Sequence, residues 1–107
     1  KAHALEQVLD TDIRAATGIQ AYVNDAALNL IYVADFSRME KMKDEDKAFY
    51  SAAHAGFIGQ NVYLFCASEG LATVVRGAID RSSLSKAMKL RPEQKITLAQ
   101  TVGYPGK

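Results

Sequence analysis

The sequence has few of the residues on which metal, disulfide or nucleophile chemistry depends. Its 107 residues include one cysteine, two histidines, two prolines and no tryptophan. The single cysteine, Cys66, excludes a disulfide within the chain, leaves the cellular compartment undecided, and is expected to be a small buried hydrophobic residue. His3, His54 and Cys66 are too far apart in the sequence to indicate a zinc site. We therefore predict no metal site and no catalytic side chain, with His54 an interface or hydrogen-bonded core residue.

Two further absences narrow the class of protein. Neither a dinucleotide-binding GxGxxG motif nor a phosphate-binding P-loop occurs in the sequence. The formal net charge is only +1, which argues against nucleic acid as a partner because a large interface would need a clear basic excess. The most apolar stretch is interrupted by His54, Gln60 and Asn61, so no membrane span is predicted. The length and composition are typical of a single globular domain.

The stretch from about Asp44 to Glu69 predicts one long helix. It opens with three acidic residues, which suit the positive end of a helix dipole, and it contains no proline. Gly70 directly after it is expected to adopt the left-handed conformation that ends a helix, with Leu71 folding back onto the last turn. The residues expected on one helical face are Phe49, Ala52, Ala53, Gly56, Gly59, Tyr63, Leu64 and Ala67.

The predicted helix is apolar on nearly every side, which indicates burial on nearly every side. At ~1.5 Å per residue it would be roughly 39 Å long. A domain of this size, with a radius of gyration of ~13 Å, cannot easily cover a helix of that length. We therefore expect part of its cover to come from a second chain.

Shorter elements flank the long helix. Strands are predicted at 28–34, 72–79 and 95–102, where branched and aromatic residues are frequent. Residues 2–9 and 12–17 are predicted as short helices, the second capped by Asp10 or Thr11 and closed by Gly18. Residues 82–89 form a third, capped by Asp80 or Ser82, and residues 103–106 form a turn. This order predicts an α+β or α/β layered domain with a small sheet.

One glycine in the second predicted strand suggests a ligand. Gly77 lies inside the strand, where glycine often marks the close approach of a ligand or of another backbone. Consecutive backbone N–H groups from Val75 to Ala78 could face a flat ring there. A bulge or a packing contact at Gly77 explains the same residue.

The order of motifs resembles the C-terminal half of the nitroreductase family of flavoproteins. The elements that carry the resemblance are Ala55-Gly56, Gln60-Asn61, Leu64, Ala67, Gly70-Leu71, Gly77-Ala78, Asp80 and Gly103-Tyr104-Pro105. The resemblance covers nearly the whole chain but only about half of the family's domain, and the family's arginine-rich phosphate-binding pattern RRSxR does not occur. Residues 5–14 are similar to the subgroup of azoline-oxidising dehydrogenases.

The resemblance implies an α+β nitroreductase-like layered fold, with a small sheet packed by helices around one long buried central helix. It implies a homodimer formed through that helix, with FMN at the interface and a hydride passed from NAD(P)H to a nitro, quinone or similar acceptor. The residues implied to line the flavin are Val75, Arg76, Gly77 and Ala78, with the Gly77 amide donating to flavin N5 and the next amide lying near O4. Arg76 replaces the usual apolar residue, and its charge would favour the anionic reduced flavin or face solvent.

The loop 36–43 corresponds to the family's variable region over the substrate face. The candidate substrate contacts there are Phe36, Met39 and Met42, although a solvated loop is the alternative. Two other functions remain open. One is an azoline-type dehydrogenase of the same fold, and the other is a flavin-free dimerisation or binding module that keeps the helix but not the cofactor.

Overall fold

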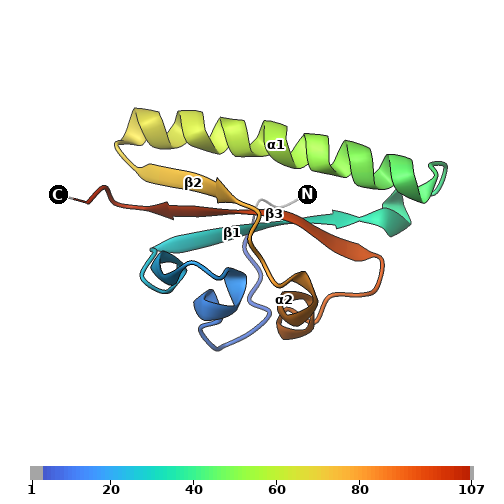
Figure 1. Cartoon of the computed structure of the whole chain (residues 1–107), viewed down its shortest axis with the longest axis horizontal. Coiled ribbons are helices and arrows are strands. Elements are labelled where there is room, and N and C mark those ends of the chain that lie inside the picture. The colour runs from blue at the N-terminus through green and yellow to red at the C-terminus, as the bar shows by residue number, and fades with distance from the viewer. Residues whose placement is uncertain (1–3, 107) are drawn as a thin grey trace.

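The protein folds into three layers, with a long helix on one face of a small sheet and short helices on the other (Figure 1). The structure, a computed structural model, describes residues 4–106. The elements in chain order are η1 (Arg14–Thr17), η2 (Ala21–Asn24), β1 (Leu28–Asp35), η3 (Phe36–Arg38), α1 (Asp44–Glu69), β2 (Ala72–Arg76), α2 (Arg81–Ala87) and β3 (Gln94–Gly103). This arrangement confirms the predicted α+β fold class.

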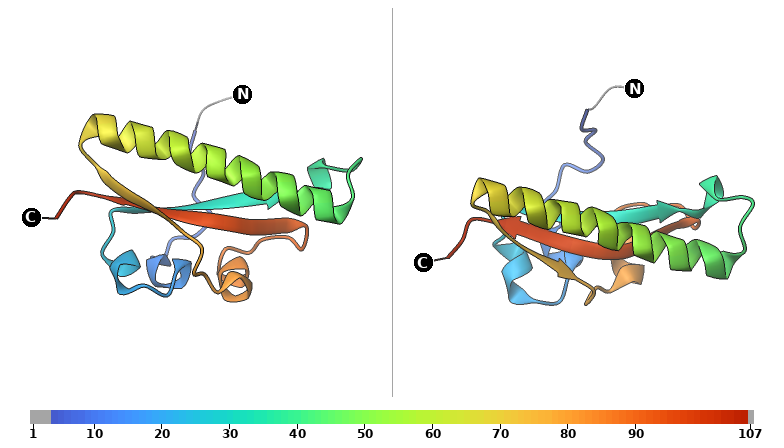
Figure 2. Two further views of the ribbon diagram at one scale, coloured as in Figure 1. Left: turned by 45° about the horizontal axis from the view of Figure 1, so that its top comes forward. Right: turned by 90° about the horizontal axis from the view of Figure 1, so that it is seen from above.

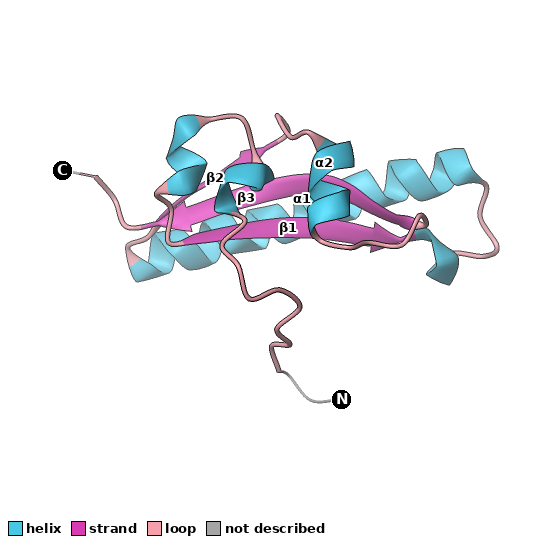
Figure 3. Ribbon diagram, turned by 90° about the horizontal axis from the view of Figure 1, so that it is seen from below, coloured by secondary structure: helices cyan, strands magenta, loops and turns pink. Residues whose placement is uncertain are grey.

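The sheet is antiparallel and has the order β1-β3-β2, so the last strand of the chain lies in the centre (Figure 3). The register pairs Leu28 of β1 with Val102 of β3, and Ala72 of β2 with Gly103 of β3. The β2–β3 ladder ends where Arg76 faces Ala99. Because β3 continues back to Gln94, its first residues have no β2 neighbour, and this gap positions the candidate site.

Helix α1 begins and ends where the sequence predicted. The first turn carries Asp44, Glu45 and Asp46, and Gly70 ends the helix with φ 69° in the left-handed region. Glycine adopts this conformation without the steric cost that a Cβ atom brings. The Leu71 N–H donates to the Cys66 carbonyl over 2.8 Å, which closes the final turn.

The helix packs closely on the sheet because its inner face is made of small residues. The buried residues of α1 are Ser51, Ala55, Gly59 and Cys66, spaced four or seven residues apart. A Cβ atom at Gly59 would lie 3.1 Å from Val75 Cγ2 of β2, so a larger residue would push the helix away from the sheet. The predicted face was therefore wrong in most positions, and only Gly59 of the fully buried residues belonged to it.

The outer face of α1 is uncovered in the single chain. Five large apolar side chains are at least half exposed: Phe49, Phe57, Ile58, Leu64 and Phe65. Figure 2 shows the same helix from two further sides, lying along one face of the sheet. The described residues of one chain cover only one side of α1, so the expected cover by a second chain stays a prediction.

The opposite face of the sheet is covered by η1, η2 and α2 (Figures 1 and 3). Val23 of η2, Leu84 of α2 and Ala99 of β3 are at most 1% exposed and form the core of this layer. The Asp80 side chain caps α2, as predicted, by accepting a hydrogen bond from the Ser83 N–H.

Four predicted elements differ from the structure. Residues 4–9 form no helix, since Leu5 is fully exposed and Val8 largely so, and the rest of that prediction lies outside the described residues. Asp12, not Asp10 or Thr11, accepts from the first amide of η1. The second strand stops at Arg76 instead of residue 79, and no turn is assigned at residues 104–106 after β3 ends at Gly103.

Candidate functional site

The four residues predicted to hold a flavin lie at the end of β2, but only two of them present accessible backbone outside the strand. Val75 and Arg76 are the last residues of β2, and Gly77 and Ala78 lead from it toward α2. The structure locates these residues, and their contact with a flavin stays a prediction.

The Val75 side chain faces α1. Its Cγ2 atom lies close to Gly59, and the Val75 N–H donates to the Tyr63 hydroxyl over 2.8 Å. Both the amide and the side chain of Val75 are therefore engaged with the long helix. Val75 supports the position of the segment and offers no free amide to a ring.

The Arg76 side chain points to the other face of the sheet and is 3% exposed. Its guanidinium donates to Thr101 Oγ1 over 2.7 Å, to the Thr17 carbonyl over 2.7 Å and to Asn29 Oδ1 over 3.2 Å. Burial lowers the pKa of the Arg76 guanidinium from its usual value. The option that Arg76 faces solvent is wrong, because neutral oxygens from η1, β1 and β3 enclose it. No carboxylate within residues 4–106 lies within salt-bridge distance of it.

Gly77 and Ala78 form the accessible part of the segment. A Cβ atom at Gly77 would meet only Leu98 Cδ2, at 3.9 Å, so one side of this peptide is open. The Gly77 carbonyl accepts from Arg81 Nη1 over 3.2 Å, and the Ala78 carbonyl accepts from the Ile19 N–H over 3.4 Å. Both peptide carbonyls are thus bound to the protein, while the glycine leaves room for a ligand beside them.

A groove lies beside this segment, at the start of β3, where β3 has no β2 neighbour. It has a volume of about 410 Å³ and runs between the first half of α1 and the start of β3. Its lining comprises Phe36, Ala48, Ser51, Ala52, Lys95, Ile96, Thr97 and Leu98. Leu98 lines the groove and is also the side chain nearest to Gly77, so groove and segment adjoin. Such an apolar groove next to free backbone suits a flat ring.

The three predicted substrate residues do not converge on this groove. Phe36 lines it, whereas Met39 lines a separate cavity of about 260 Å³ that shares Ser51 and Thr97 with the groove. Met42 is 43% exposed and lies at the end of the loop 37–42, outside the groove. Of the three, only Phe36 therefore lines the groove that adjoins the segment at Gly77.

Sequence reasoning missed Leu98 and Arg81. The alternation of β3 was the one signal that placed Leu98 on a sheet face, and it did not indicate where β2 would end. Arg81 carried no signal, because an exposed arginine at the start of a short helix is common. His54 lines the same cavity as Met39 and takes no part in the groove.

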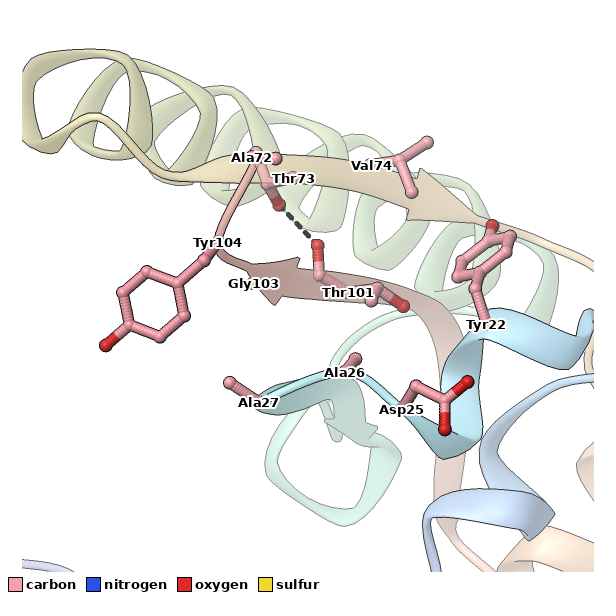
Figure 4. Close-up of a pocket in the computed structure, with 10 residues that line it drawn as sticks. All are labelled: Tyr22, Asp25, Ala26, Ala27, Ala72, Thr73, Val74, Thr101, Gly103 and Tyr104. Atoms are coloured by element: carbon pink, nitrogen blue, oxygen red, sulfur yellow. Dashed lines mark hydrogen bonds between the residues drawn. The ribbon is translucent and has the colours of Figure 1, made fainter. Parts of the chain in front are cut away.

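A second hollow, of about 610 Å³, lies at the other end of β2 (Figure 4). Ala72 and Val74 of β2 form one wall, η2 and the residues after it form another, and Tyr104 stands at the open end. A hydrogen bond of 2.8 Å from Thr73 Oγ1 to the Thr101 carbonyl joins the two strands at its floor. Asp25 is the one carboxylate that the described residues contribute to its lining, and none of the predicted site residues lines it.

Two classes of site are absent from the part of the chain that the structure describes. No three histidine, cysteine, aspartate or glutamate side chains there gather in a way that could hold a metal ion. Among the same residues, no helix has the length and apolarity needed to cross a membrane.

Comparison with known proteins gives the family. The sequence model of the nitroreductase family matches residues 1–104. The chain belongs to the nitroreductase family.

Individual relatives agree with this assignment. A crystal structure from Ralstonia eutropha, provisionally described as a nitroreductase, is 39% identical and has a TM-score of 0.87 over 95% of this chain and 49% of its own. A protein of Methanocaldococcus jannaschii, provisionally named a nitroreductase, is 26% identical over 83% of this chain and 47% of its own length. A nitroreductase family protein of Streptococcus pneumoniae, 20% identical with a TM-score of 0.58 over 66% of this chain and 36% of its own, shares the fold. The chain spans about half the length of the relatives it matches most extensively.

Proposed function

We propose that this chain forms part of an FMN-dependent oxidoreductase of the nitroreductase type. The observation that carries the proposal is the open backbone at Gly77 and Ala78, whose carbonyls are bound to the protein beside an apolar groove. Bound FMN would supply hydride-transfer chemistry, by which a hydride from NAD(P)H reaches a nitro, quinone or similar acceptor in two half-reactions at one site. This chemistry requires no protein nucleophile.

The residues of this chain fit the ring of FMN better than its phosphate. Gly77 has open space where any other residue carries Cβ, and Leu98 and Phe36 give the neighbouring groove apolar walls. Among residues 4–106, the groove lining includes a single basic residue, Lys95. In this proposal, the backbone N–H groups of Gly77 and Ala78 bind and orient the ring. The contacts of Val75 and Arg76 with the rest of the protein hold the end of β2 in place.

The test is flavin retention by the full-length protein and by its Gly77→Val variant. We expect purified protein reconstituted with FMN to retain a flavin spectrum that is released on denaturation. Gly77→Val should abolish retention because the side chain would occupy the open side of the peptide. The fold should survive, since the only neighbour of a Cβ atom there is 3.9 Å away. Gly106→Val, which has nothing within 4 Å, is the matched control.

Two results would count against the proposal. A colourless protein that takes up no added FMN would favour the flavin-free binding module. A Gly77→Val protein with unchanged flavin content would place the cofactor elsewhere.

We further propose that the outer face of α1 binds a second copy of the chain. Support comes from Phe57, Leu64 and Phe65, which lie on one helix and are each more than half exposed. The formal net charge of the chain is only +1, so charge repulsion between two copies is small. Sedimentation equilibrium should detect a dimer, and Phe57→Glu together with Phe65→Glu should shift it to monomer. A monomeric unsubstituted protein at micromolar concentration would refute this interface. Gly77→Val should leave the dimer intact.

A further inference from the structure

Arg81 makes an unusual set of contacts at the start of α2. Its side chain donates to three backbone carbonyls: Nη1 to Gly77 over 3.2 Å, Nε to Ile96 over 3.3 Å, and Nη2 to Thr97 over 2.6 Å. Within residues 4–106, no carboxylate lies within salt-bridge distance of its guanidinium. Within these residues, the Arg81 guanidinium therefore binds backbone carbonyls and forms no ion pair.

The position of these carbonyls explains why an arginine is needed. The β2–β3 ladder stops at Arg76 and Ala99, so Ile96 and Thr97 lie in the part of β3 beyond the end of β2. A guanidinium is a planar fork with five N–H donors, which suits several carbonyls at once. Arg81 thereby joins the segment after β2 to β3, where strand pairing no longer does so.

Arg81 also determines the direction of one amide. The peptide bond is planar, so the Gly77 carbonyl and the Ala78 N–H point in opposite directions. Because Arg81 binds the carbonyl on one side, the Ala78 N–H is directed to the other side. The bond from the Ile19 N–H to the Ala78 carbonyl restrains the next peptide in the same way.

Capping of α2 does not account for Arg81. The carboxylate of Asp80 already accepts from the Ser83 N–H over 3.1 Å and from the Ser83 hydroxyl over 2.9 Å. The Arg81 side chain reaches away from its own helix to residues 77, 96 and 97. Its contacts hold the segment between β2 and α2 against β3.

We propose that Arg81 is a positioning residue for the cofactor segment, holding the peptide between Gly77 and Ala78 in the orientation that receives the flavin ring. The inference rests on the proposed function, because it assigns a purpose to the segment at which FMN is proposed to bind. A binding group fixed before the ligand arrives loses less entropy on binding, so a rigid amide binds more tightly than a mobile one.

The test compares Arg81→Met and Arg81→Lys with the unsubstituted full-length protein. Methionine keeps the apolar stem but removes the donors, and we expect FMN to bind about tenfold more weakly, because the freed peptide must then be ordered when the ring binds. Lysine keeps the charge without the fork and should recover only part of the affinity. The visible absorption bands of bound FMN should shift in Arg81→Met, because the amide beside the ring is no longer fixed. Arg91→Met is the control, since Arg91 is exposed and its side chain donates to Glu93 and Asp35.

The readouts separate a positioning role from a structural one. Melting temperature without FMN reports stability alone, and backbone amide chemical shifts of Gly77 and Ala78 in the same samples report the segment directly. We expect shifted amide resonances in Arg81→Met and none in Arg91→Met. If Arg81→Met folds poorly, Arg81→Lys supplies the same comparison.

The outcomes distinguish this inference from the function on which it rests. FMN binding by the unsubstituted protein together with unchanged affinity and spectrum in Arg81→Met would overturn the role of Arg81 alone. Failure of the unsubstituted protein to bind FMN would overturn the proposed function and this role with it. Weaker binding in Arg81→Met, accompanied by shifted flavin bands and partial recovery with lysine, would support both.

Discussion

Replacing Gly18 by alanine should destabilise the protein, because the new side chain would displace the distant residue Arg76. Gly18 follows η1 with φ −178° and ψ 172°, an extended conformation that any residue adopts. The backbone is therefore no obstacle to alanine. A Cβ atom there would lie 2.1 Å from Arg76 Nη1 and 3.2 Å from Val23 Cγ1, so the guanidinium would have to move.

The size of the effect follows from the contacts of Arg76. Moving Nη1 by roughly 1 Å breaks its 2.7 Å hydrogen bond to the Thr17 carbonyl. A hydrogen bond to a charged group contributes about 1.5–3 kcal/mol, whereas alanine in place of glycine stabilises by about 0.4–1 kcal/mol through the unfolded chain. We expect a net loss of about 1.5 kcal/mol in the free energy of unfolding, or a fall in Tm on the order of 10 °C.

The assay is urea denaturation followed by far-UV circular dichroism, at one fixed protein concentration because dimerisation adds to stability. Gly56→Ala is the control: Gly56 lies in α1 with nothing within 4 Å, so alanine should stabilise by about 0.5–1 kcal/mol. In an Arg76→Met background the cost of Gly18→Ala should largely disappear, since the flexible thioether can yield. An equal cost in both backgrounds, or a stabilising Gly18→Ala, would refute the argument.

Two other predictions concern buried and pH-dependent hydrogen bonds. Tyr32→Phe should cost about 1.5 kcal/mol in urea denaturation, because the Tyr32 hydroxyl donates to Oε1 of the fully buried Gln100, whereas Tyr50→Phe on the exposed part of α1 should change little. Hydrogen bonds from Ser83 hold the pKa of Asp80 below its usual value, so the contribution of the charged carboxylate is complete above about pH 4 and is lost as the pH falls through the folded-state pKa. Asp80→Asn should therefore lower Tm at neutral pH, and the difference should shrink in acid; a difference that stays undiminished as the carboxylate becomes protonated would contradict this assignment.

The sequence was sufficient for elements that depend on local signals. Helix α1 was predicted with its bounds because acidic residues mark its start and Gly70 its end, and β1 was predicted from its branched residues. The inward face of α1 could not be read from periodicity, since apolar residues surround the helix. The face of α1 that packs on the sheet is the one with the smallest side chains. It is selected by the close contact with Val75 and not by hydrophobicity.

The candidate site depended on contacts that the sequence does not display. Arg76 is buried by Thr17, Asn29 and Thr101, which are 25–59 residues away along the chain. Its burial therefore could not be inferred from its neighbours in sequence. The family motif did indicate Gly77, but the groove beside it exists only because β2 ends before β3, and that mismatch in length arises from pairing.

The strand order has a consequence for how the protein is made. Among residues 4–106, β1 and β2 pair only with β3, and β3 leaves the ribosome after both of them. Until residues 94–103 emerge, the first two strands have no partner and α1 has no sheet on which to pack. Folding of this unit therefore waits for residues 94–103 and depends on contacts between distant residues, which are slow to form. A ribosome stalled shortly before residue 94 would hold a chain with two unpaired strands and an apolar helix, the kind of species that chaperones bind.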